Sequence, residues 1–118
     1  MVVLKELKEI LETNSLSFSS VNKNAFPHTI YVLYAKVIGG NKILITDNYM
    51  KKIKENILEN KTAALSLLVG EAAFELCGTA EYFSSGELID KIKAIPENKG
   101  APCKGAIVVS VKEIVKMG

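Results

Sequence analysis

Residues 43–60 read ILITDNYMKKIKENILEN, and this stretch decides both the fold and the candidate site. Its first residues are aliphatic and β-branched, which predicts a strand that ends at Thr46. Asp47-Asn48 has the composition of a turn. From Met50 to about Asn60 the apolar residues recur with the period of an α-helix. The stretch therefore predicts a strand, a polar turn and an amphipathic helix in direct succession.

The start of this predicted helix is a candidate anion site. The first N–H groups of a helix have no intrahelical partner, and together with the helix dipole they favour a negative charge. Lys51 and Lys52 add two ammonium groups at the same place, where the dipole alone disfavours cations. A bound phosphate would reverse that penalty. The alternative is that the two lysines only form the solvent-exposed face of the helix.

The rest of the chain predicts strands that are joined mainly by hairpins. With strand 42–46, the segments rich in β-forming residues give six strands in total, and the other five are residues 16–21, 28–38, 63–69, 72–83 and 105–116. Gly39-Gly40 and Gly70-Glu71 are short enough to require tight hairpins, for which Gly39-Gly40 would supply positive φ angles.

Two further helices are expected. Leucines and isoleucine at helical spacing predict an amphipathic helix over residues 3–13. Ser84 and Glu87 match a capping box, so a second helix should run from about Ser85 to Ala94. Strands and helices do not alternate regularly along the chain. This order favours an antiparallel barrel or sandwich over a doubly wound sheet.

Length and composition indicate one globular domain over residues 1–118. Hydrophobic residues make up 48% and charged residues 24% of the 118 residues. The start, MVVLKELKEI, has acidic residues where a signal peptide would be apolar, and no apolar run approaches the ~20 residues that span a bilayer. We therefore expect a cytoplasmic protein without a membrane partner. The net charge of +2, the scattered lysines and the absence of Arg give nucleic-acid binding little support.

The potential metal ligands and nucleophiles are few. Cys77 and Cys103 form no CxxC motif, and His28 is the only histidine, so no metal site is expected. We interpret the cysteines as reduced, packed thiols, with a disulfide as the alternative in an oxidising compartment. His28 has no nucleophile motif beside it and is interpreted as structural, so no catalytic side chain is assigned.

An N-terminal helix and then four segments, in this order, resemble the FMN-binding split barrels related to pyridoxamine 5′-phosphate oxidase, most closely their small single-domain flavoproteins. The segments are PHTIYVLYAKVIGGNKILIT, DNYMKKIKENILEN, ALSLLVGEAAFELCGTAEYF and KGAIVVSVKEIVKM. The resemblance covers nearly the whole chain. It implies a mainly β fold, a six-stranded antiparallel Greek-key split β-barrel with about three short helices.

The resemblance also implies an FMN site. The strand that ends at Thr46 would lie beside the flavin ring, and the turn and first helical residues would wrap the ribityl phosphate. The ring and ribityl chain would be approached by Tyr31, Val32, Thr46, Asp47, Asn48 and Tyr49, and the phosphate would be held by Met50, Lys51 and Lys52.

Other positions are expected to be structural or depart from the family pattern. Asn56 matches a frequent structural Asn, and the Gly78-Thr79-Ala80-Glu81 step is interpreted as a site of close packing. Ile53 stands where many relatives have Thr or Ser, so one hydroxyl donor to the phosphate is missing. Because Arg is absent, we do not expect true pyridoxamine 5′-phosphate oxidase activity.

These observations lead to three functional hypotheses. The first is an FMN-dependent oxidoreductase or electron carrier, a homodimer with the flavin at its interface and a small-molecule electron donor or acceptor. The second is a non-catalytic module that binds FMN or another cofactor, such as F420 or haem. The third is a barrel that has lost its ligand and serves only in dimerisation.

Overall fold

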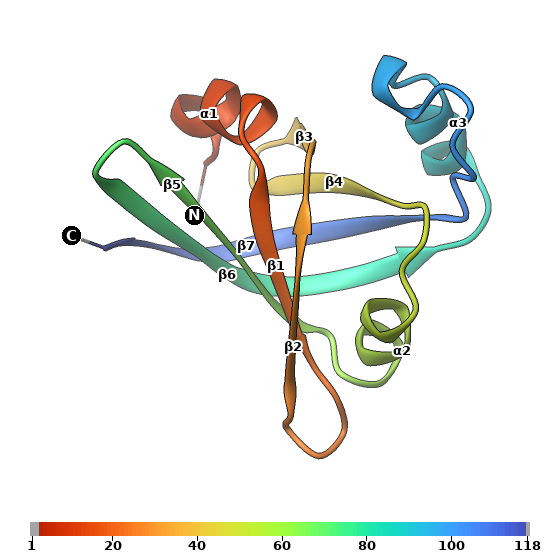
Figure 1. Cartoon of the computed structure of the whole chain (residues 1–118), viewed down its shortest axis with the longest axis horizontal. Coiled ribbons are helices and arrows are strands. Elements are labelled where there is room, and N and C mark those ends of the chain that lie inside the picture. Colours follow the sequence, from red (N-terminus) through yellow and green to blue (C-terminus); the bar gives the residue numbers. More distant parts are fainter. Residues whose placement is uncertain (1–2, 118) are drawn as a thin grey trace.

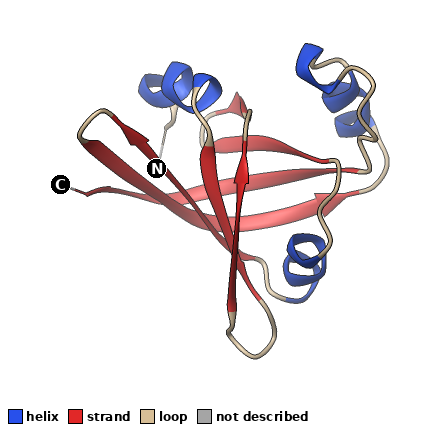
Figure 2. Cartoon of the chain, in the orientation of Figure 1, coloured by secondary structure: helices blue, strands red, loops and turns tan. Residues whose placement is uncertain are grey.

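The computed structural model describes residues 3–117. Its strands form one antiparallel sheet of seven strands in the order β2-β1-β5-β6-β7-β4-β3 (Figure 1). The strands are β1 (Leu16–Val21), β2 (Pro27–Val32), β3 (Lys36–Gly39), β4 (Lys42–Asp47), β5 (Thr62–Val69), β6 (Ala72–Phe83) and β7 (Gly105–Met117). The helices, which lie around the strands in Figure 2, are α1 (Lys8–Thr13), α2 (Lys52–Glu59) and α3 (Glu87–Lys93), with the 3-10 turns η1 (Lys5–Leu7) and η2 (Pro96–Asn98).

The expected mainly β fold with short helices is confirmed, but the described residues contain seven strands rather than six. The strand predicted over residues 28–38 is interrupted after Val32 and resumes at Lys36. The reason is topological, because β2 pairs with β1 at one edge of the sheet and β3 pairs with β4 at the other. The chain has to leave one edge and join the opposite one within a few residues.

Several predicted boundaries also differ. The first predicted helix is divided into η1 and α1. The capping box at Ser84 does not form, because α3 begins after Gly86, which has a φ of 98° and provides no side-chain cap. Gly39 and Gly40 are not among the glycines with positive φ, whereas Gly70 in the β5–β6 turn is, at 60°.

β4 is buried on both faces, which fixes the position of the segment that follows it. Ile43 and Ile45 belong to the main hydrophobic core with residues of β1, β5 and β7. Leu44 faces a second cluster, in which Ile92 of α3 packs with residues next to and within β7. Because both of its faces are packed, the carboxyl end of β4, where the turn to α2 begins, has a fixed position.

Gly78 allows β6 and β7 to approach closely, as the sequence analysis expected. The strand register shifts between Cys77 and Gly78, so that Gly78 pairs with Val111. A Cβ atom at Gly78 would overlap the carbonyl group of Ser110. The packing interpretation of this glycine is therefore confirmed.

A buried carboxylate anchors the turn between β4 and α2. Asp47 is 0% exposed, and its Oδ1 accepts a hydrogen bond of 2.8 Å from the backbone N–H of Met50. Its Oδ2 accepts a 2.5 Å hydrogen bond from the Tyr82 hydroxyl of β6, and Lys104 Nζ lies 3.9 Å from Oδ1. Because Asp47 binds the N–H of Met50, the chain turns there and α2 begins at Lys52 rather than at Met50.

We predict that Gly78→Ala lowers the free energy of unfolding by about 1–3 kcal/mol, because the new methyl group has to displace backbone. Urea denaturation measures the change. Gly39→Ala is the matched control, since nothing lies within 4 Å of its Cβ position and its φ is not positive, and it should change stability little. Equal effects of the two substitutions would contradict this account of Gly78.

We also predict that Tyr82 makes the protein less stable at alkaline pH. Burial raises the pKa of the Tyr82 hydroxyl in the folded protein. The hydrogen bond to Asp47 and the charge of Asp47 raise it further. The unfolded chain therefore loses this proton first, and the free energy of unfolding falls as the pH rises above about 10, the ordinary tyrosine pKa.

Urea denaturation between neutral pH and pH values above about 10 tests this prediction. Tyr82→Phe should be less stable than the wild type at neutral pH, and its stability should fall less steeply at high pH. Tyr31→Phe, at a position that is 76% exposed, should follow the wild-type profile. A Tyr82→Phe profile parallel to that of the wild type would show that the phenol proton is not linked to folding.

Candidate functional site

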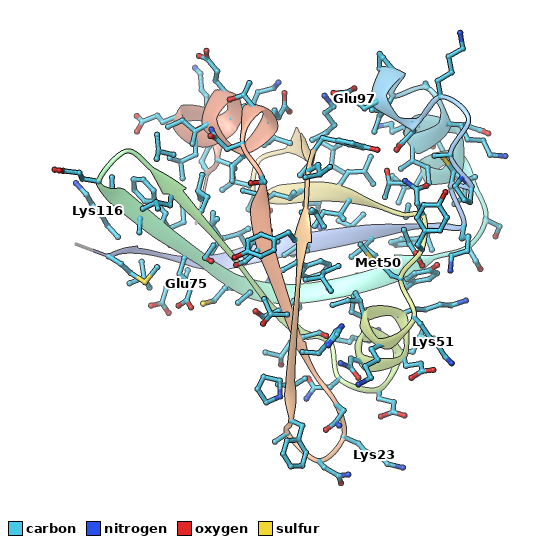
Figure 3. The ribbon with its side chains drawn as sticks, viewed as in Figure 1. Lys23, Met50, Lys51, Glu75, Glu97 and Lys116 are labelled. Atoms are coloured by element: carbon cyan, nitrogen blue, oxygen red, sulfur yellow. The ribbon has the colours of Figure 1, made fainter. Side chains whose placement is uncertain are left out.

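A cleft of about 580 Å³ lies between β2 and the segment that joins β4 to α2. Figure 3 labels Met50 and Lys51 on that segment, beside the strands. The lining is mostly apolar and consists of His28, Ile30, Tyr31, Val32, Leu33, Tyr34, Thr46, Asn48, Tyr49, Met50, Lys51, Lys52 and Ile53. Its volume is within the range of sites for small molecules and cofactors.

The structure brings eight of the nine predicted site residues to this one cleft, namely Tyr31, Val32, Thr46, Asn48, Tyr49, Met50, Lys51 and Lys52. Asp47 does not line it, because its buried side chain faces Tyr82 and Lys104. The backbone N–H of Met50 is also occupied, since it donates to Asp47. Met50 can therefore contribute its side chain to the cleft but not this amide.

Part of the cleft lining is cationic. α2 spans eight residues and has no side-chain cap at Lys51. Its first intrahelical hydrogen bond runs from the N–H of Glu55 to the carbonyl of Lys51, at 3.1 Å, which leaves the N–H groups of the first turn without intrahelical partners. Lys51 and Lys52 are exposed beside this turn. Lys54 is not in the lining, because its ammonium lies 5.0 Å from the centroid of the Tyr82 ring.

Polar residues also line the cleft or contact its lining, and the sequence did not predict two of them. Thr46 and Asn48 were expected there, but Tyr34 and the buried Asn98 were not. Asn98 Nδ2 donates to Thr46 Oγ1 at 2.9 Å, and the Tyr34 hydroxyl donates to Asn98 Oδ1 at 2.9 Å. Asn98 comes from η2, far along the chain, and no motif around it signals this contact.

The rim of the cleft exposes large apolar side chains. Tyr31 is 76% exposed, Leu33 73% and Tyr49 83%. Exposed apolar side chains that gather around one cleft are typical of a surface that is covered by a ligand or by another protein chain.

Asn56 has the structural role expected for it, since it is buried and donates a 3.0 Å hydrogen bond to Ser20 Oγ.

Cys77 and Cys103 are both free, and neither lines the cleft. Burial raises the pKa of Cys77. The neighbouring Glu75, whose carboxylate accepts a hydrogen bond from the thiol, raises it further. His28 is half-buried and lies in the cleft lining.

Within residues 3–117, His, Cys, Asp and Glu side chains do not gather in any group of three that could bind a metal ion. In the same range, the helices are too short or too polar to cross a bilayer.

Comparison with known proteins gives relatives that span nearly the whole chain. An uncharacterized protein of Methanocaldococcus jannaschii is 29% identical, with 96% of this chain and 79% of that protein covered. Three solved structures share the fold at low sequence identity, and they establish the fold alone.

The first of these structures is HupZ of Group A Streptococcus, which superposes with a TM-score of 0.87 at 16% identity over 99% of this chain and 94% of HupZ. An FMN-binding protein from Syntrophomonas wolfei has a TM-score of 0.76 at 15% identity, over 96% and 82% of the two chains. The haem storage protein HutZ of Vibrio cholerae has a TM-score of 0.70 at 12% identity, over 98% and 94%.

The fold of these neighbours is the split barrel that the sequence resemblance implied. A family model described as pyridoxamine 5′-phosphate oxidase matches residues 3–118, which is almost the entire sequence. With this match, the chain belongs to the pyridoxamine 5′-phosphate oxidase family.

Proposed function

We propose that this protein binds FMN in the cleft between β2 and the β4–α2 segment, with the phosphate at Lys51 and Lys52. The observation that carries the proposal is the set of residues that line the cleft. The lining combines a cationic helix start at Lys51 and Lys52, hydrogen-bonding groups at Thr46 and Asn48, and apolar side chains. This combination matches a molecule with a phosphate, an apolar planar ring and a polar ring edge.

The phosphate end supplies strong but solvent-exposed contacts. Near neutral pH a phosphate monoester carries a charge of about −1.5 to −2. Each charge-assisted hydrogen bond to it contributes about 1.5–3 kcal/mol. Two ammonium groups, the free amides of the helix start and burial of the ring together support at least micromolar affinity, about −8 kcal/mol.

Bound flavin supplies hydride or electron transfer, so the residues of the cleft only have to bind and orient it. We propose a role as an oxidoreductase or electron carrier with a small-molecule partner. In this role Val32 and the Tyr31 and Tyr49 rings contact the flavin ring, while Asp47 holds the turn in shape from behind. The two free thiols are consistent with a cytoplasmic location.

A second copy of the chain completes the site in this proposal. The exposed Tyr31, Leu33 and Tyr49 at the rim would be covered on formation of a two-fold dimer. Covering them removes apolar surface from water and also shields the flavin ring from solvent.

A non-catalytic haem-binding module is the second candidate. It is favoured by His28, whose imidazole lies in the lining of the cleft and is the side-chain type that binds haem iron in many proteins. The haem storage protein HutZ shows that this fold also occurs in a haem protein.

The visible spectrum of the purified protein, followed by mass analysis of any small molecule released by heat, distinguishes the candidates. Released FMN supports our proposal, whereas haem that is lost in His28→Ala supports the second candidate. Bleaching of bound flavin by a physiological reductant supports an oxidoreductase. A colourless protein that binds neither group in titrations would contradict both.

We predict that Lys52→Glu weakens FMN binding by about tenfold or more, because it replaces an attractive charge at the phosphate with a repulsive one. Lys54→Glu makes the same charge change two residues later but outside the cleft lining, so it should weaken binding much less. Titration of the apoprotein followed by flavin fluorescence measures both constants. Equal losses of FMN affinity in the two variants would show that the phosphate does not bind at Lys52.

We further predict that Leu33→Lys raises the dissociation constant of the dimer by about tenfold or more, as expected when a central apolar contact is lost. The control is Leu68→Lys, which lies outside the lining and is exposed to 68%, against 73% for Leu33. Light scattering over a range of concentrations gives the mass of each variant, relative to 12.9 kDa for one chain. A monomeric wild-type protein would refute the dimer.

A further inference from the structure

Backbone groups fix the orientation of the two amide side chains, Asn98 and Asn48, that lie beside Thr46. Asn98 is 2% exposed, and its Nδ2 lies 2.8 Å from the carbonyl oxygen of Ile92. A carbonyl can only accept, so the amide nitrogen of Asn98 has to face Ile92. The second hydrogen of Nδ2 then points to Thr46 Oγ1, 2.9 Å away.

Asn48 supports this assignment independently. The backbone N–H of Cys103 can only donate, and it lies 2.8 Å from Asn48 Oδ1. The Nδ2 of Asn48 therefore faces Asn98, whose Oδ1 is 3.4 Å away. The Ile92 carbonyl thus fixes the orientation of the Asn98 amide, and the Cys103 N–H fixes that of the Asn48 amide. In these orientations a donor, Asn48 Nδ2, faces an acceptor, Asn98 Oδ1.

This arrangement leaves Thr46 with a hydrogen to donate. Its oxygen accepts from Asn98, and among the hydrogen bonds of the described residues its hydroxyl donates none. Thr46 is among the residues that line the cleft, so the unused hydrogen is available to a ligand there. The Tyr34 hydroxyl, in contrast, can only accept a hydrogen bond from a ligand, because its own hydrogen is donated to Asn98 Oδ1.

We propose that Asn98 is a positioning residue that fixes the Thr46 hydroxyl as a hydrogen-bond donor to the acceptor edge of the bound ring. The proposal rests on the proposed function and adds a specificity element to it. An oxidised flavin presents carbonyl and imine acceptors along its polar edge, which this donor matches. A ring with an apolar edge leaves the same hydroxyl unpaired, which costs binding energy in a buried site.

The experiment compares the infrared spectrum of FMN bound to the wild type, Thr46→Val and Thr46→Ser. Thr46→Val has nearly the same shape but no hydroxyl, so a carbonyl or imine stretch of the ring should shift. FMN affinity should also fall, by about fivefold to tenfold. Thr46→Ser restores the donor and should restore the wild-type bands. Thermal unfolding of each apoprotein checks that the variants fold.

Asn98→Leu tests the positioning role, and Asn98→Gln replaces it if the leucine variant does not fold. Either change frees the Thr46 hydroxyl to rotate, so the same band should shift in part. In the Thr46→Val background the change at Asn98 should have no further effect on that band. Independent, additive shifts would overturn the role of Asn98.

Failure of this inference is distinguishable from failure of the proposed function. Wild-type protein that binds FMN with the same ring bands as Thr46→Val would overturn the inference alone. Wild-type protein that does not bind FMN would overturn the proposed function and this inference with it.

Discussion

The hydrogen bond from the Met50 N–H to the buried Asp47 carboxylate is the contact on which the site depends. It lies where β4 ends and fixes the turn that brings the start of α2 to the cleft it shares with β2. The other oxygen of the carboxylate binds Tyr82 of β6, and the Asp47 carbonyl accepts from the N–H of Lys104, directly before β7. One residue therefore links the turn to three strands, and the shape of the cleft follows from the packing of the sheet.

The local elements of this fold could be predicted because each has its own signal in the sequence. The β-forming residues before Thr46 and the helical pattern after it identified the strand, turn and helix that form one wall of the cleft. The break between Val32 and Lys36 had no such signal, since it arises from pairing at opposite edges of the sheet. Asn98 was missed for a similar reason: it contacts Thr46 across 52 positions of the chain, in a loop without a recognisable motif.

Asp47 lies in the turn that was predicted for it but does not have the predicted role. An acidic residue in a predicted binding turn was expected to contact the ligand. A carboxylate beside a phosphate would repel it, and the structure instead buries Asp47 behind the turn, where its charge faces Tyr82 and Lys104. This placement leaves Lys51 and Lys52 as the charged groups on the side of the turn that faces the cleft.

The cationic and the polar parts of the cleft differ in how much their groups are exposed. Ile53 is 1% exposed and packs in the main core, so this position supplies no hydroxyl donor beside Lys52. The cationic part thus presents exposed ammonium groups, whose attraction for an anion is screened by salt. Thr46 and Asn98, in contrast, are buried, and the Ile92 carbonyl fixes the orientation of the Asn98 amide that binds Thr46. In the site that we propose, long-range attraction of the phosphate is therefore assigned to the helix start, and discrimination between rings to Thr46 and Asn98.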